Sequence, residues 1–200
     1  MAIERLDQSQ VKRRSESASE RTLVLAAQRG DASAFRQLYD AYRDRIYSLV
    51  LYSIGDPFNA QDVLQTVFLK VFRGLRSFRL QSSLSTWIYR IAHNECQDHH
   101  RRRTVTHVPL EAILGSRDEI DTKVRSDDRH ARQEREKIIQ RALMQLPFKM
   151  REAVILKYVE GLSYDEMSGV LGCAPGTVAS RLNRALVELE ERLRPFKHLL

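Results

Sequence analysis

Histidine and cysteine, which often bind metal or act in catalysis, gather in one short stretch of this sequence. His93, Cys96 and His100 are three and four residues apart, with His99 beside them. Such a row on one helix has ligand types that suit zinc, and it is the basis of the alternative that the protein is an enzyme. A single straight helix rarely supplies three ligands at tetrahedral angles. The neighbouring residues are arginines, and no pair of side chains that could activate a water molecule accompanies the row. We therefore expect no metal site, no cofactor and no catalytic residue.

A second group of polar side chains lies near the C-terminus, on a segment that the sequence predicts to be helical. They fall off the stripe of apolar residues that recurs at helical spacing from Val178 to Leu193. Arginine can bind a guanine edge or a phosphate, while serine and threonine suit phosphates or bases. The alternative is that the arginines are ordinary solvated charges. The candidates for DNA contact are Thr177, Ser180, Arg181 and Arg184.

The elements before these candidates have the pattern of a helix-turn-helix. Ser163 and Glu166 form a capping box, which predicts that a short helix begins at Ser163. That helix is expected to end at Gly172, where glycine tolerates a left-handed backbone. Residues 173–177 then open the longer helix with the four candidates. A short helix, a tight turn and a longer helix are what the insertion of a helix into the major groove requires.

The N-terminal half has three stretches with helical periodicity. One helix is expected from Ala26 through Val50, and residues 55–57 then break the pattern, with Asp56 as a cap and Pro57 in a first turn. A second helix is expected to end near Gly74. A third follows a polar loop at residues 77–83. The buried stripe predicted for the second helix consists of Val63, Leu64, Val67, Phe68, Val71 and Phe72, and that for the third of Leu84, Trp87, Ile88, Ile91 and Ala92.

These patterns predict an all-α fold with two small helical domains joined by a flexible linker. We expect a mobile N-terminal arm at residues 1–20, a first domain at 21–103, a linker at 104–133 and the helix-turn-helix domain at 134–200. Residues 153–159 have strand-like propensity, but their helical surroundings favour a buried helical turn. Cys96 and Cys173 are far apart without a CxxC pair, so reduced thiols are expected.

The charge of the chain favours a polyanionic partner. The formal net charge is +7, and the excess lies in residues 21–103, with 13 Lys and Arg against 7 Asp and Glu. A basic surface attracts nucleic acid or an anionic membrane. The membrane alternative lacks an amphipathic helix with basic and exposed aromatic faces. No apolar run is long enough for a membrane span or a signal peptide, so we expect no membrane insertion and a cytoplasmic location.

Both halves of the chain resemble one family of bacterial proteins. Leu146-Pro147, EGLSYDEM (160–167) and GTVASRLNRA (176–185) resemble the second promoter-binding domain of extracytoplasmic-function sigma factors of RNA polymerase. NAQDVLQTVFLKVFRGLRSF (59–78) and STWIYRIAHNECQDHHRRR (85–103) resemble the first promoter-binding domain of that family. The resemblance implies a transcription initiation factor that binds core RNA polymerase and promoter DNA and helps to open the minus-10 region. It also implies an anti-sigma factor as a partner.

The resemblance assigns contacts with polymerase to the second helix. Four positions match the part of the family that docks on the polymerase clamp: Asp62, Gln65, Phe68 and Leu69. Phe68 and Leu69 are equally suited to packing in the core, so the polar pair Asp62 and Gln65 is the better candidate for the interface. Gln61 and Thr66 stand where relatives usually have acidic residues, which indicates a weaker or altered contact.

The third helix matches the segment of the family that captures the melted minus-10 strand. A melted base needs stacking surfaces and polar groups, with cations for the backbone. Asn94 is the preferred base-reading residue, while Trp87 suits packing and DNA contact equally. The matched residues are Thr86, Trp87, Arg90, Asn94, Asp98, Arg101, Arg102 and Arg103.

The recognition helix also departs from the family at Ala179 and Asn183, so the promoter sequence cannot be inferred from relatives. The remaining alternative is a transcription regulator of another helix-turn-helix family. Such a regulator would bind duplex DNA alone. A sigma factor would instead bind DNA weakly alone and drive transcription when core polymerase is added.

Overall fold

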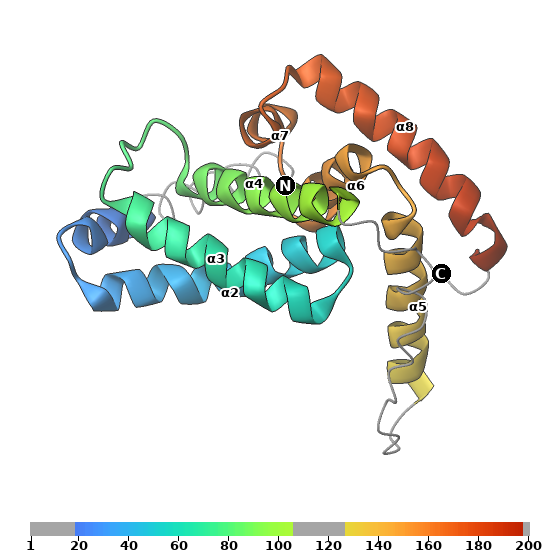
Figure 1. Ribbon diagram of the computed structural model, residues 1–200, viewed down its shortest axis with the longest axis horizontal. Helices are drawn as coiled ribbons and strands as arrows, with labels where there is room; N and C mark the ends of the chain where they lie inside the picture. Colours follow the sequence, from blue (N-terminus) through green and yellow to red (C-terminus); the bar gives the residue numbers. More distant parts are fainter. Residues whose placement is uncertain (1–18, 106–126, 198–200) are drawn as a thin grey trace, which may run out of the picture.

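Helices alone form the regular structure of the described part of the chain, residues 19–105 and 127–197 of a computed structural model (Figure 1). A helical stretch at residues 19–28 comes before the helices labelled in the figure. The all-α prediction is therefore confirmed for these ranges. The elements are, in order, α2 (Ala32–Ile54), α3 (Pro57–Leu75), α4 (Leu84–Val105), α5 (Asp127–Met144), α6 (Phe148–Val154), the π-helical turn η2 (Ile155–Val159), α7 (Tyr164–Leu171), α8 (Pro175–Leu193) and the 3-10 turn η3 (Arg194–Phe196).

The first long helix is interrupted where the sequence pattern predicted continuity. Gly30 takes a left-handed backbone with φ of 95°. Asp31 then caps α2, because its carboxylate accepts hydrogen bonds from the amides of Ser33 at 2.8 Å and Ala34 at 3.1 Å. The prediction of one helix from Ala26 through Val50 is wrong, since glycine and an N-cap residue together favour a turn over a continued helix.

The other predicted helix ends agree with the structure. Asp56 caps α3 by accepting from the amide of Phe58 at 3.0 Å, and Pro57 occupies the first turn. Ser163 and Glu166 form both halves of the capping box of α7. Gly172 ends that helix with φ of 62°. Helix ends that depend on hydrogen bonds among a few adjacent residues can therefore be predicted from the sequence.

The predicted linker and arm fall partly outside the described residues. Residues 1–18 and 106–126 are not described, so most of the expected arm and linker is untested. Within the expected linker, helix α5 already begins at Asp127. Residues 153–159 are helical, with α6 passing into η2, as the sequence analysis expected.

The helices form two groups that pack on each other. In the first group, α2, α3 and α4 lie side by side, and the second group contains α5 through α8 (Figure 1). Helix α7 of the second group lies against α4 of the first, and α2 contacts α5 and η2. The buried apolar side chains form one cluster that runs through both groups. This arrangement brings the two predicted DNA-binding surfaces into one body.

Candidate nucleic-acid and polymerase interfaces

The recognition helix of the predicted helix-turn-helix is α8. Its apolar stripe is turned inward, with Val178, Leu182, Ala185 and Leu189 buried. Three of the four predicted DNA-contacting residues, Thr177, Ser180 and Arg184, are exposed on the opposite side. Such a helix has an inner face that fixes its position and an outer face with hydrogen-bonding groups available to DNA.

Arg181 differs from the other three candidates because it is half-buried. Its guanidinium donates to the Sγ of Cys173 at 3.4 Å, in the turn before α8. Sequence spacing does not pair these two residues, because they are eight positions apart on either side of the start of a helix. The contact holds the arginine near the beginning of the recognition helix, where base contacts are usually made.

The predicted minus-10 residues are distributed around α4. Arg90, Asn94 and residues 101–103 are exposed. Thr86 is buried, with 7% of its surface exposed, and its hydroxyl lies 2.7 Å from that of Ser83. Trp87 is half-buried and stacks on Phe78 with ring centroids 4.8 Å apart. In this arrangement Trp87 packs within the first helical group and Thr86 does not reach solvent freely.

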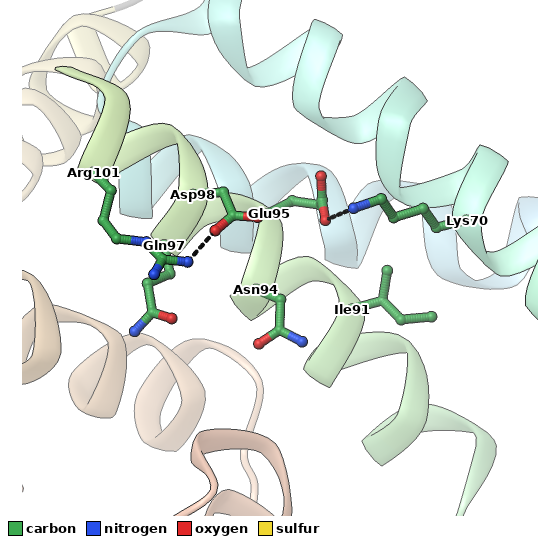
Figure 2. Close-up of a pocket in the computed structure, with 7 residues that line it drawn as sticks. All are labelled: Lys70, Ile91, Asn94, Glu95, Gln97, Asp98 and Arg101. Carbon is green, nitrogen blue, oxygen red and sulfur yellow. Dashed lines mark hydrogen bonds and ion pairs between the residues drawn. The ribbon is translucent and has the colours of Figure 1, made fainter. Parts of the chain in front are cut away.

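A polar pocket of about 310 Å³ lies beside Asn94 between α3 and α4 (Figure 2). Lys70 reaches from α3 to form an ion pair with Glu95, and Arg101 pairs with Asp98 along α4. The amides of Asn94 and Gln97 line the same pocket. The pocket thus combines amide donors and acceptors with nearby cations, the groups that an unstacked base and its phosphate require. Its lining residues are Lys70, Ile91, Asn94, Glu95, Gln97, Asp98 and Arg101.

The predicted polymerase residues border an aromatic groove between α2 and α3. Gln65, Phe68 and Leu69 line this groove, whose volume is about 640 Å³, and Asp62 is exposed on α3. Phe68 is buried and packs edge-to-face on Tyr39, so it has a packing role in this structure. Leu69 is 49% exposed. An exposed apolar groove with a polar rim is typical of a protein-binding site.

Phe72 was placed wrongly by the sequence pattern. It was expected in the buried stripe of the second helix, but it is 57% exposed and lines the same groove. Its ring packs edge-to-face on Phe35 of α2 with centroids 5.0 Å apart. Apolar periodicity marks an apolar face and does not tell whether a neighbouring helix or an external partner covers it.

The histidines and the cysteine of the zinc alternative do not converge. His93 places Nδ1 2.8 Å from the carboxylate of Glu152, and His100 stacks on Phe148 with centroids 4.6 Å apart. Cys96 is buried, and burial raises the pKa of its thiol. Over residues 19–105 and 127–197, no group of three His, Cys, Asp or Glu side chains is arranged to hold a metal ion.

A polar seam that the sequence patterns did not predict lies between the two groups of helices. Glu152 on α6 binds His93, and Glu160 accepts from Arg45 at 3.2 Å and from the hydroxyl of Tyr89. Arg151 donates to the carbonyl of Ser53 at 2.5 Å. Burial raises the pKa of Glu152, and burial with the bond to Glu160 raises the pKa of Tyr89. The sequence signal is that Glu152 stands directly before the apolar residues 153–156 and Glu160 directly after Val159.

The same seam joins the helix-turn-helix to the minus-10 helix. The Nε of Arg90 on α4 donates to the carbonyl of Gly169 on α7 at 2.7 Å. A Cβ built on Gly169 would stand 3.2 Å from the Cγ2 of Thr86. The bare backbone at Gly169 therefore allows the two helices to approach closely.

Comparison with known proteins identifies the family of this chain. The family model described as sigma-70 region 2 matches residues 38–106, and the model described as sigma-70, region 4 matches residues 136–189. The RNA polymerase sigma-H factor of Pseudomonas aeruginosa is 37% identical over 179 residues, which are 86% of this chain and 93% of that protein. This chain belongs to the sigma-70 family. Its α2–α4 and α5–α8 groups contain most of the matches to region 2 and region 4, respectively.

Two further relatives place the chain in the extracytoplasmic-function group of sigma factors. The ECF RNA polymerase sigma factor SigW of Bacillus subtilis is 30% identical over 86% of this chain and 95% of that protein. The ECF RNA polymerase sigma-E factor of Escherichia coli is 32% identical over 90% of this chain and 97% of that protein. The resemblance found in the sequence motifs is therefore confirmed.

Solved structures support the fold. CnrH in complex with the cytosolic domain of CnrY has a TM-score of 0.68 at 23% identity and covers 88% of this chain and 98% of that chain. The sigma factor RpoE in complex with the anti-sigma factor NepR from Bartonella quintana has a TM-score of 0.62 at 25% identity, over 80% of this chain and 96% of that chain. Among the described residues, no helix has both the length and the apolar character needed to cross a bilayer.

Proposed function

We propose that this sigma-70 family member is a transcription initiation factor that binds core RNA polymerase, directs it to specific promoters and helps to open the minus-10 region. The observation that carries the proposal is the presence of both region 2 and region 4 in one chain, each with an exposed polar helical surface. A duplex-binding regulator needs only the second of these. The first domain at residues 21–103 and the helix-turn-helix domain at 134–200 are the proposed working parts.

In this proposal the region 4 domain reads the minus-35 element as duplex DNA. Exposed Thr177, Ser180 and Arg184 on α8 are available for phosphates and base edges. Arg181, held at the start of the helix by Cys173, is the proposed base-reading arginine. The inward apolar stripe of α8 supports this assignment, because it leaves only this face for DNA.

The region 2 domain is proposed to hold the separated minus-10 strand. Asn94 lies at the pocket beside α4 and supplies donor and acceptor groups for one unstacked base. Asp98 lines the same pocket, and Trp87 and Thr86 lie earlier on the helix. Arg90 and residues 101–103 supply the cations for phosphates. Binding energy for unstacked bases offsets a few kcal/mol of unstacking per step, so strand separation needs no covalent chemistry from the protein.

The groove between α2 and α3 is the proposed docking site for core polymerase. Leu69 and Phe72 present apolar surface there, and Asp62 and Gln65 supply polar groups at or near its rim. Apolar anchors within a polar rim are what a protein interface needs. Phe68 is proposed to support this surface from below through its contact with Tyr39.

The remaining parts of the proposal concern partners and location. We propose that the protein works in the cytoplasm, where its polymerase and promoter partners are, and that it does not act as an enzyme. An anti-sigma factor is the proposed regulator, supported by the structural neighbour RpoE, which was solved in complex with the anti-sigma factor NepR.

The test is run-off transcription with purified core polymerase on a random promoter library, with and without this protein. The proposal expects transcripts from a distinct set of promoters only when the protein is present. Co-purification of the protein with core polymerase at low salt is expected as well. A protein that neither associates with core polymerase nor selects promoters would refute the proposed function, and specific duplex binding alone would favour another class of regulator.

A further inference from the structure

A surface with charges of one sign covers the end of α3 and the loop that follows it. Residues 63–94 contain no Asp or Glu but five Lys or Arg residues. Three of these five, Arg73, Arg76 and Arg79, are exposed at the end of α3 and in the loop, and we call them the basic loop surface. None of the three forms an ion pair or a side-chain hydrogen bond with another described residue, whereas exposed arginines of α2 pair with neighbouring aspartates. Cations gathered without acidic partners favour an anionic ligand.

The backbone beneath the basic loop surface is held in place from several sides. The Nε2 of Gln28, which comes before α2, donates to the carbonyls of Leu75 at 3.0 Å and Phe78 at 2.8 Å. The ring of Phe78 is buried and stacks on Trp87 of α4. Leu80 packs against the core and has a left-handed backbone with φ of 55°. Such a conformation costs free energy for a residue other than glycine and is often found at functional sites. The loop therefore presents its arginines from a fixed backbone.

The basic loop surface begins beside the polar pocket that contains Asn94. Arg73 follows Lys70, which lines the pocket, by three residues, so both lie on one side of α3. Figure 1 shows the loop and the start of α4 at one end of the α2–α4 group, with α4 running away from the loop. Arg101 lies about 25 Å along α4 from Leu84, at a rise of 1.5 Å per residue. The pocket is therefore between two groups of cations, one at the loop and one at residues 101–103.

We propose that the basic loop surface is a second phosphate-binding site, which holds a single strand of DNA where it leaves the Asn94 pocket on the side away from residues 101–103. A strand with one base in the pocket has to continue in both directions, and its flexible backbone can follow cations placed along a protein surface. Arginine suits this role, since its planar guanidinium binds two phosphate oxygens at once. That the strand is promoter DNA rests on the proposed function, whereas phosphate binding is a property of the chain itself.

The salt dependence of DNA binding tests this site. The probe is an oligo-dT strand of about 15 nucleotides, compared with a duplex of the same length, and fluorescence anisotropy measures its affinity for the full chain at several salt concentrations. Each phosphate contact on a single strand contributes about 0.7 to the slope of log affinity against log salt. The triple variant Arg73→Gln, Arg76→Gln, Arg79→Gln should therefore reduce this slope by about 2. Replacing the same three residues by Lys keeps the charge and should keep most of the slope.

A matched control makes the same change of charge elsewhere. Arg135→Gln, Lys137→Gln and Arg141→Gln remove three cations from exposed positions of α5, and this variant should keep the native slope. Far-UV circular dichroism checks that all variants are folded. Equal slopes for the Gln variant of the basic loop surface and for the control overturn the site. A larger loss of slope on the duplex than on the single strand overturns the assignment to a single strand.

The same proteins separate this inference from the proposed function. A reduced slope for the Gln variant, together with no promoter-dependent transcription by the native protein and core polymerase, supports the phosphate site and refutes the proposed function. Transcription by the native protein with an unchanged slope for the Gln variant overturns the phosphate site and leaves the proposed function standing.

Discussion

Replacement of Arg151 is expected to be among the most damaging single changes in this protein. The side chain is 5% exposed and donates to three backbone carbonyls, those of Ser53, Met144 and Leu146, at 2.5, 3.1 and 3.2 Å. Arg151→Met keeps most of the aliphatic stem but leaves all three carbonyls without this donor. In the native protein these three hydrogen bonds connect α2 of region 2 with the end of α5 in region 4.

The magnitude follows from these contacts. Hydrogen bonds to a charged group contribute about 1.5–3 kcal/mol each to stability, and Arg151→Met loses three of them. The variant recovers part of this free energy, because methionine has no charge that must be desolvated when the chain folds. Burial lowers the pKa of Arg151, which is the sign of that desolvation cost. We expect the free energy of unfolding to fall by about 3–5 kcal/mol, the range for breaking a buried charged contact. A domain has about 5–15 kcal/mol in total, so the loss is large.

Urea unfolding measures this loss, with far-UV circular dichroism for all helices and Trp87 fluorescence for region 2. Arg194→Met is the matched control, because Arg194 is exposed at the end of the chain. Arg151→Lys should give an intermediate loss, since an ammonium cannot span all three carbonyls. A loss of only about 0.5 kcal/mol for Arg151→Met, equal to the control, would refute the interpretation, because exposed substitutions have effects of that size.

Four further predictions concern binding and pH. Arg181→Ala should weaken binding to a minus-35 duplex by about 1–3 kcal/mol in fluorescence anisotropy, and an unchanged affinity would contradict base reading by this residue. Asn94→Ala should reduce permanganate reactivity of the minus-10 strand more than promoter occupancy, and equal losses would exclude its placement. Leu69→Asp should weaken association with core polymerase by about tenfold while circular dichroism stays unchanged, because the side chain is half exposed. Burial raises the pKa of Cys96 above its ordinary value of 9.0. The stability that the protonated thiol contributes is fully present well below pH 9 and is lost as pH rises, so from pH 9 to 10 the native protein should lose about 1 kcal/mol more than Cys96→Ala.

The parts of the fold that the sequence predicted are those that adjacent residues determine. The capping box at Ser163, the glycine turn at Gly172 and the break at residues 55–57 each depend on side chains that bond to their own backbone neighbourhood. The faces of the recognition helix could also be predicted, because which residues point inward and which point outward follows from helical spacing alone. The break at Gly30 was missed because an apolar period on both sides concealed a local cap.

The parts that could not be predicted depend on contacts between distant segments. No spacing rule pairs His93 with Glu152 or Tyr89 with Glu160, which are 59 and 71 positions apart. The burial of Thr86 follows from the approach of α7, and the exposure of Phe72 from the absence of a covering helix in the described part of the chain. Each is set by which other helices pack nearby, and single-helix patterns contain no information on that.

The continuous apolar cluster has a practical consequence for dissecting the molecule. A fragment that ends after α4, or one that begins at α5, would expose the apolar and ionisable side chains that the other half now covers. Such fragments should be prone to self-association, and their DNA affinities would describe surfaces that the intact chain keeps covered. A chimera that joins this region 2 to a region 4 from another sigma factor would need matching partners for Arg45, Tyr89 and His93 to fold as one body.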